Sequence, residues 1–216
     1  MGLKIMMAVS GLYFVLFVLM HMYGNLKILA GHEQFDTYAH HLRILGEPML
    51  PYSGFLWIFR ITLIIALIAH VYSALTLWGR AGRARQQRYL VKDAMHTAVS
   101  SRTMRWGGVA LLLFIVFHLL QFTLRSFYVG TDPVSSPAAM VVAAFQTPWL
   151  TLIYVLAMIA LGLHLHHGVW SACQTLGFTN TAKARGTAKM TAAVVAGLVV
   201  IGFLIPPLAI QFGMIK

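Results

Sequence analysis

Five apolar stretches, each long enough to cross a lipid bilayer, dominate this chain of 216 residues. A transmembrane helix needs about 20 mainly apolar residues, and the stretches occupy residues 5–28, 54–78, 105–128, 148–172 and 188–212. Hydrophobic residues make up 59% of the chain and charged residues 10%, which leaves too few polar side chains to cover a soluble globule. We therefore predict a single all-α membrane domain, residues 1–216, with five transmembrane helices. Pro206-Pro207 should kink or end the fifth helix.

The charged residues lie mostly in the gaps between these stretches, and the gaps differ in charge. Residues 79–105 hold seven basic residues and one acid, and residues 173–189 hold three basic residues and no acid. The other gaps balance Lys27, Arg43, Arg125 and Lys216 with Glu33, Asp36, Glu47 and Asp132. The positive-inside rule therefore places the N-terminus in the cytoplasm and the C-terminus outside. We expect the net charge of +11 to face anionic lipid or a partner protein, not nucleic acid.

Two gaps on the predicted outer side contain local signals. In residues 29–53, Phe35, Tyr38, Leu42 and Leu45 recur at three- and four-residue spacing, which predicts a short amphipathic helix on the outer interface. A polar loop with incidental apolar side chains is the alternative. Residues 129–147 contain Asp132-Pro133 and Ser136-Pro137, which are turn signals.

Residues 5–79 resemble residues 104–176, which indicates an internal repeat. The segment from Gly11 to His21 matches the segment from Gly108 to His118 in its glycine, its histidine and the pair Phe17/Phe114, and residues 65–70 match residues 159–164. The two halves have the same predicted orientation. A parallel repeat implies a pseudo-two-fold axis along the membrane normal.

Four of the apolar stretches each contain a histidine, namely His21, His70, His118 and His164. At 1.5 Å per residue, His21 and His118 lie about 7 and 2 Å outside the centres of their stretches, and His70 and His164 each lie about 6 Å inside. We therefore predict an outer pair, His21 with His118, and an inner pair, His70 with His164. For a single such histidine the alternative to metal ligation is a hydrogen bond to a neighbouring helix, or a position that faces a water-filled cavity.

Two imidazoles on facing helices are the ligands of an electron-transfer haem, and an apolar bundle suits the porphyrin plane. A zinc or copper site would gather three or four ligands at one level, and this pattern has only two at each level. A proton relay usually includes Asp or Glu, and neither residue occurs in these stretches. The single Cys173 excludes a disulfide framework, a structural zinc site and an all-cysteine iron–sulfur cluster within this chain. We therefore predict two stacked haems in the four-helix bundle.

Other residues are candidates for contacts with these haems. Arg60 and Arg125 lie towards the outer ends of their stretches and are candidate propionate partners, although Arg60 has snorkelling to the interface as an alternative. His167 lies one turn from His164 on nearly the same helix face and is a candidate propionate or quinone contact. Three glycines can admit a macrocycle or permit close helix packing, namely Gly24, Gly162 and Gly168.

With these residues in place, the chain resembles the single-polypeptide dihaem cytochrome b anchor of succinate:quinone oxidoreductases and fumarate reductases. The segments that carry the resemblance are FVLMHMYGN (17–25), IAHVYSA (68–74), FIVFH (114–118) and GLHLHHGVWS (162–171). The resemblance implies a proximal haem on His70 and His164 and a distal haem on His21 and His118. It also implies a bacterial cytoplasmic membrane, and flavoprotein and iron–sulfur partner subunits that carry covalent FAD and the clusters. Electrons from succinate would then reach a quinone, often menaquinone.

One position departs from the resemblance, and the quinone site has only candidates. Some dihaem fumarate reductases carry a glutamate where this chain has Gly162, so a glutamate-based proton path is in doubt. For an outer quinone site we expect Tyr38, His41 and Glu47, because His or Glu can exchange the protons that a quinone needs. An inner site would use His167, Trp170 and Trp78.

Two alternative functions and one partner surface complete the predictions. The first alternative, also a redox protein, is a dihaem cytochrome b of a formate dehydrogenase, hydrogenase or nitrate reductase complex. A transporter that uses histidines as proton carriers belongs to another class. In the leading interpretation, Arg83, Arg85 and Arg88 face the iron–sulfur subunit, and neutralising them should loosen its binding in a salt-sensitive way.

Overall fold

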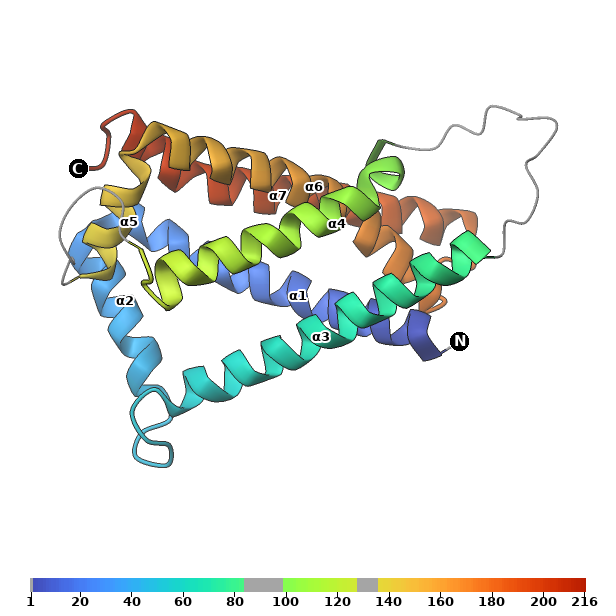
Figure 1. The fold of residues 1–216 in the computed structure, drawn as a ribbon, viewed down its shortest axis with the longest axis horizontal. Coiled ribbons are helices and arrows are strands. Elements are labelled where there is room, and N and C mark those ends of the chain that lie inside the picture. Colours follow the sequence, from blue (N-terminus) through green and yellow to red (C-terminus); the bar gives the residue numbers. More distant parts are fainter. Residues whose placement is uncertain (1, 84–98, 128–135) are drawn as a thin grey trace.

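The computed structural model describes residues 2–83, 99–127 and 136–216, and every regular element in these ranges is helical (Figure 1). Five helices are long and apolar enough to cross a membrane, which confirms the predicted fold class. The two chain ends lie towards opposite ends of the molecule, as an odd number of spans requires (Figure 1). The elements in chain order are α1 (Gly2–Leu26), the 3₁₀ turn η1 (Lys27–Ala30), α2 (His32–Ile44), α3 (Gly54–Arg83), α4 (Val99–His118), the π-helical turn η2 (Leu119–Thr123), α5 (Pro137–Phe145), α6 (Pro148–Thr175) and α7 (Ala182–Gln211).

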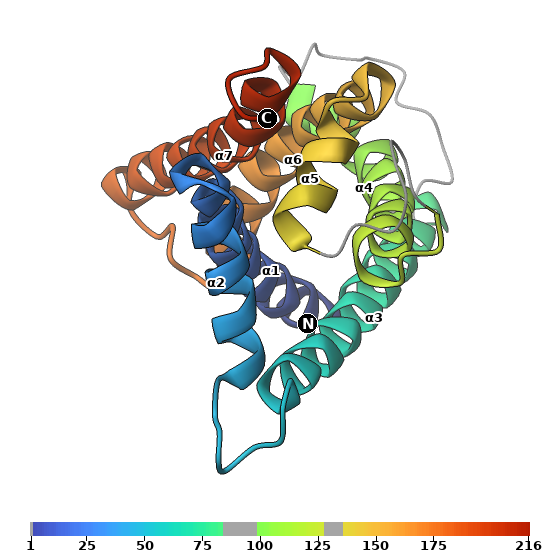
Figure 2. The ribbon, with the colours of Figure 1, turned by 90° about the vertical axis from the view of Figure 1, so that its left-hand side faces the viewer.

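The long helices form two antiparallel pairs joined by a fifth helix. Helix α3 packs on α1, α4 packs on α6, and α7 packs on both α6 and α1, while α1 also packs on α6. Within the described part of the chain, α1 is not closely packed on α4, nor α3 on α6. Figure 2 shows this arrangement from one end, with α3 and α4 along one side and α7 on the other.

The two sides of the bundle differ in how closely they are packed. Ser73 is the one buried residue of α3, whereas α6 and α7 bury eight and nine residues respectively. Small residues permit this close packing. A Cβ atom at Gly162 would lie 2.7 Å from Val200 Cγ2, and one at Gly202 would overlap Met22. Gly162 therefore seats α6 on α7, so it makes no room for a macrocycle beside the histidines.

Helices α2 and α5 cover the end of the bundle that carries the acidic side chains. Helix α2 confirms the amphipathic helix predicted within residues 29–53. The prediction of a turn at Ser136-Pro137 is wrong, because these residues start α5: the Ser136 hydroxyl accepts from the Ala139 amide, and Pro137 takes the first helical position. The Asp36 carboxylate accepts from the Ala138 amide at 2.8 Å and ties α2 to α5.

Two predicted helix ends are also revised. Helix α7 continues through Pro206 and Pro207 to Gln211, so of the two expected outcomes, a kink or an end at these prolines, the end is wrong. Both prolines are buried, and prolines are tolerated in membrane helices because neighbouring helices compensate for the lost backbone bond. The third apolar helix ends earlier than residue 128, since α4 stops at His118 and the π turn η2 continues it only to Thr123.

Candidate functional site

The outer pair of histidines meets between α1 and α4. The ring centres of His21 and His118 are 5.9 Å apart, and the ring planes lie at 77°. Each ring stacks on the phenylalanine four residues before it: Phe17 lies 5.3 Å from His21, and Phe114 lies 6.0 Å from His118. The structure thus brings together two rings that are 97 residues apart, on two helices that are not otherwise closely packed.

The inner pair meets between α3 and α6. The ring centres of His70 and His164 are 6.2 Å apart, with the planes at 57°. These two helices also lack close direct packing in the described part of the chain. Both pairs that depth in the membrane predicted are therefore adjacent in space. No cluster of three or more His, Cys, Asp or Glu side chains suited to a metal ion occurs among the described residues.

The ring nitrogens of His70 are assigned by their surroundings. Its Nδ1 lies 3.2 Å from the Met7 carbonyl oxygen and 3.2 Å from Ser10 Oγ. A carbonyl only accepts, so His70 Nδ1 carries the proton and donates to it. Ser10 Oγ donates to the Met6 carbonyl at 2.7 Å, which leaves its lone pairs free to accept from His70. The Nε2 lone pair of His70 is then available as a metal ligand.

A second chain of hydrogen bonds places the proton of His118 on Nδ1. The Tyr154 hydroxyl donates to Gln121 Oε1 at 2.9 Å, so its oxygen accepts from His118 Nδ1 at 3.1 Å. Gln121 is buried and belongs to the π turn that follows His118. Such π turns are rare and frequently occur at functional sites. Ser10, Tyr154 and Gln121 were missed by the sequence analysis, because their role depends on the rotation of each helix about its axis.

Two glycines make room for the inner rings. A Cβ atom at Gly11 would lie 3.2 Å from His70 Cε1, and one at Gly108 would lie 3.5 Å from His164 Cε1. These two glycines begin the matching segments of the two halves, so the signal for them was present in the sequence. Of the glycines that were predicted instead, Gly24 lies against Tyr38, and Gly168 lies 3.9 Å, measured from its built Cβ, from Met104 Cε.

Of the two predicted propionate partners, Arg60 lies on α3 and Arg125 follows the π turn η2. Arg60 is exposed, with its guanidinium 5.2 Å above the Trp57 ring. Arg125 is exposed just after the π turn and has a positive φ of 52°. His167 is half-buried one turn from His164, towards the basic end of the bundle.

The three outer quinone candidates lie on α2 and in the segment after it. Tyr38 is half-buried against α1, edge-on to Tyr23 at 6.1 Å, while His41 and Glu47 are exposed. Burial raises the pKa of Tyr38, the neighbouring Tyr23 raises it further, and the Lys27 ammonium opposes the shift. Tyr38 is therefore neutral at pH 7 and can both donate and accept a hydrogen bond.

Comparison with known proteins shows the family of this chain. The family model described as "Succinate dehydrogenase/Fumarate reductase transmembrane subunit" matches residues 80–205, more than half of the chain. The chain belongs to this family. No curated protein and no solved structure matches it.

Family membership makes the chain a membrane-anchor subunit of a succinate dehydrogenase or fumarate reductase. It favours this function over the formate dehydrogenase, hydrogenase, nitrate reductase and transporter alternatives. The matched region runs from the end of α3 to most of α7 and includes His118 and His164. His21 and His70 precede the matched region, and they are linked to it by their adjacency to His118 and His164.

Proposed function

We propose that the chain binds two b-type haems, one between His70 and His164 and one between His21 and His118, and conducts electrons across the membrane to a quinone. The observation that carries this proposal is the spacing of the rings, 6.2 and 5.9 Å. If two imidazoles bind one metal ion in line, each metal–nitrogen bond is about 2.0–2.1 Å and each nitrogen lies about 1.1 Å from its ring centre. The two ring centres are then about 6.3 Å apart. The donor set fits as well, because His70 and His118 both have Nδ1 engaged and Nε2 free.

Bound haem supplies one-electron transfer, and the chain supplies everything that positions it. Met7 and Ser10 orient the His70 ring, and Tyr154 with Gln121 orients the His118 ring. Gly11 and Gly108 leave space beside the inner rings. We assign Arg60 and Arg125 to the outer propionates, because both are exposed cations near the level of the outer pair.

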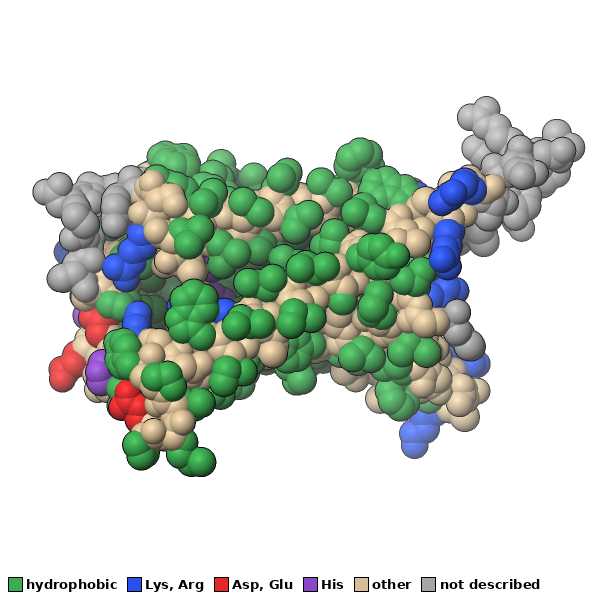
Figure 3. Space-filling model, turned by 60° about the horizontal axis from the view of Figure 1, so that its bottom comes forward, with side chains coloured by type: hydrophobic (Ala, Val, Ile, Leu, Met, Phe, Trp, Pro, Cys, Tyr) green, Lys and Arg blue, Asp and Glu red, His purple; other side chains and the backbone are tan. Residues whose placement is uncertain are grey.

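The charge of the two ends supports an orientation with the N-terminus in the cytoplasm. Figure 3 shows basic side chains at one end of the molecule and a mixture of acidic, basic and histidine side chains at the other. In the described ranges, the basic end carries Lys4, Arg80, Arg83, Arg105, Lys183, Arg185 and Lys189 without an acid. The positive-inside rule favours the cytoplasmic side for this end, and we take the membrane to be a bacterial inner membrane. Arg85 and Arg88 lie outside the described residues.

This end is where we place the flavoprotein and iron–sulfur subunits, which carry the FAD and the clusters. In this arrangement succinate would be oxidised in the partner subunits, and haems held by His70 with His164 and by His21 with His118 would supply one-electron transfer towards the quinone. The quinone, which we take to be menaquinone, receives the electrons at the outer face, where Tyr38, His41 and Glu47 remain our candidates for its contacts. Tyr38 has a neutral phenol there as a hydrogen-bond donor.

The haem content of single-histidine variants tests the proposal. We expect the purified complex to contain two haems per chain by the pyridine haemochrome assay. His70→Ala and His164→Ala should each remove the same haem, while His21→Ala and His118→Ala remove the other. His40→Ala is the matched control, since His40 is exposed on α2. Retention of both haems in His70→Ala, or loss of one in the control, contradicts the assignment.

A further inference from the structure

At the basic end of the bundle, α3 and α4 meet through aromatic and basic side chains. The Trp78 and Trp106 rings lie edge to face with their centres 6.1 Å apart, and the Arg105 guanidinium lies 5.3 Å from the centre of the Trp78 ring. In the described ranges the two helices are not otherwise closely packed on each other. Arg105 therefore lies at a seam that side chains bridge.

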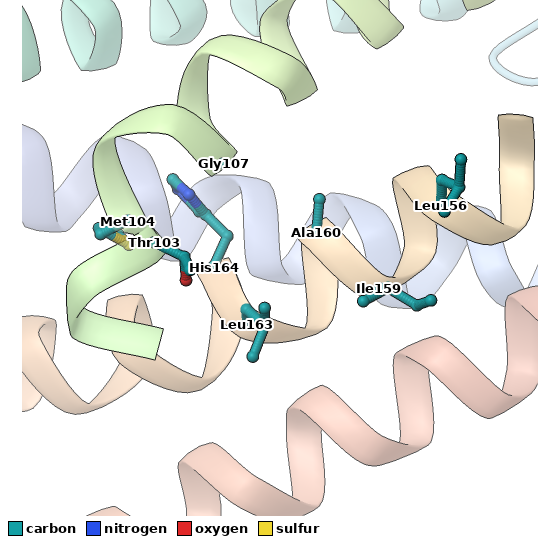
Figure 4. A pocket seen from close by; sticks show the side chains of 8 residues that line it. All are labelled: Thr103, Met104, Gly107, Leu156, Ile159, Ala160, Leu163 and His164. Carbon is teal, nitrogen blue, oxygen red and sulfur yellow. The ribbon is translucent and has the colours of Figure 1, made fainter. Parts of the chain in front are cut away.

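The opposite side of α4 faces α6, which leaves the seam turned towards the lipid. Thr103, Met104 and Gly107 line a cavity of about 180 Å³ between α4 and α6, and Figure 4 shows them where α4 approaches α6. Because a helix has 3.6 residues per turn, Arg105 and Trp106 point away from this cavity. Both side chains are exposed, Trp106 at 72%. The seam is therefore accessible from the side of the bundle.

The seam lies at the boundary between the hydrocarbon and the lipid headgroups. Trp78 is the last residue of the second apolar stretch, and Arg105 is the first residue of the third. Tryptophan is enriched at this boundary in membrane proteins. Towards the middle of the membrane, exposed apolar side chains of both helices follow, namely Tyr72, Leu75, Val109 and Leu113. The seam thus presents cations at the level of the headgroups and an apolar surface at the level of the acyl chains.

The cations at the seam have no carboxylate beside them in the described part of the chain. The acids of that part all lie at the opposite end of the bundle (Figure 3), namely Glu33, Asp36 and Glu47. A second guanidinium comes from α3, since Arg83 Nη2 lies 3.8 Å from a Cβ atom built on Gly79, the residue after Trp78. A guanidinium stacked on an aromatic ring keeps its N–H edge free, and this planar fork matches two oxygens of a phosphate.

We propose that this seam binds the phosphodiester group of an anionic phospholipid, with Arg105 as its main contact. The Trp78 ring holds the guanidinium, whose N–H groups donate to two phosphate oxygens. The basic side chains around the seam attract the net negative charge of the lipid, and its acyl chains lie along the exposed apolar surface. A carboxylate of the iron–sulfur subunit fits less well, because Arg105 and Trp106 face sideways from the bundle. The site needs no haem, so it is independent of the haem assignment.

Native mass spectrometry of the purified complex, titrated with dioleoylphosphatidylglycerol, measures the dissociation constant of the tightest-bound lipid. Dioleoylphosphatidylcholine has the same acyl chains and phosphodiester without net charge. Arg105→Gln removes the cation, and Arg105→Lys keeps the charge without the planar fork. Arg185→Gln is the matched control, because Arg185 is exposed at the same end, on α7, and donates to the Thr179 carbonyl without an aromatic partner. An unchanged melting temperature shows that a variant is folded, and Arg105→Lys carries the test if Arg105→Gln unfolds.

We expect the wild type to bind phosphatidylglycerol at least about ten-fold more tightly than phosphatidylcholine, the effect of one charge-assisted hydrogen bond. Arg105→Gln should lose most of this preference. Arg105→Lys should weaken the binding to a smaller extent, because an ammonium group is a point charge and offers no fork. Arg185→Gln should bind phosphatidylglycerol as the wild type does.

Four results overturn the proposal. The first is equal binding of phosphatidylglycerol by the wild type and both Arg105 variants. The second is an equal loss in Arg185→Gln, which would indicate diffuse surface charge. The third is displacement of the lipid by an excess of inorganic phosphate, which would assign the site to free phosphate. The fourth is release of the iron–sulfur subunit from Arg105→Gln with unchanged lipid binding, which would place Arg105 in the partner surface.

Discussion

Removal of the Tyr154 hydroxyl should raise the reduction potential of the outer haem. In the structure this hydroxyl accepts from His118 Nδ1 at 3.1 Å and donates to Gln121 at 2.9 Å. A hydrogen bond from Nδ1–H makes a ligating imidazole more basic and favours the ferric state. Tyr154→Phe removes the acceptor, keeps the ring, and should therefore favour the ferrous state.

The size of the shift follows from the free energy of one neutral hydrogen bond. That free energy is about 0.5–1.5 kcal/mol, and about 1.4 kcal/mol corresponds to about 59 mV for a one-electron couple. We therefore expect the potential of the outer haem to rise by about 20–60 mV. The inner haem should keep its potential, because Tyr154 contacts the outer pair and the aromatic cluster around it.

Redox titration of the purified complex, followed in the visible α bands, measures both potentials. Tyr13→Phe is the matched control: the Tyr13 hydroxyl also makes a 2.7 Å hydrogen bond between helices, but to Thr62 and not to a histidine. A Tyr154→Phe complex with two haems and an unchanged outer potential would falsify the reasoning. So would an equal shift in the Tyr13→Phe control.

Three further predictions concern the inner pair, the packing and the partner surface. Ser10→Ala should raise the potential of the inner haem by less than Tyr154→Phe raises the outer one in the same titration, because the Met7 carbonyl still accepts from His70. Gly202→Leu should lower the melting temperature of the complex by about 2–12 °C, because the added side chain meets Met22 and overpacking costs about 1–3 kcal/mol. Gly197→Leu is the control and should leave the melting temperature unchanged, because an added Cβ there has open space. Replacement of Arg83, Arg85 and Arg88 by Gln should release the iron–sulfur subunit at lower salt than in the wild type, and an unchanged elution profile at every salt concentration would limit these arginines to topology.

Position along a helix could be predicted from the sequence, whereas rotation about the helix axis could not. Each residue advances 1.5 Å along the axis, so His21 and His118 were assigned to one level and His70 and His164 to another, and the structure brings the members of each pair together. The direction in which a side chain points depends on how the helices pack. Gly162 accordingly proved to face Val200 on α7 and not the bundle interior.

Other features were missed because one local signal has two outcomes. Ser136-Pro137 is typical both of a turn and of a helix start, and burial of the apolar helix behind it decided for α5. The π turn after His118 has no signature in the sequence, yet it accompanies the placement of Gln121 beside Tyr154.

The inner and outer histidine pairs differ in how far a substitution can change the hydrogen bonds that orient their rings. His70 is held partly by the backbone carbonyl of Met7, so this hydrogen bond does not depend on which side chain stands at position 7. His118 depends on two side chains, Tyr154 and Gln121, so a single substitution alters it. The position that matches Tyr154 in the first half is Arg60, which lies over Trp57. The repeat thus duplicates the histidines but not their supports, and the two proposed haems would therefore differ in potential even with the same ligands.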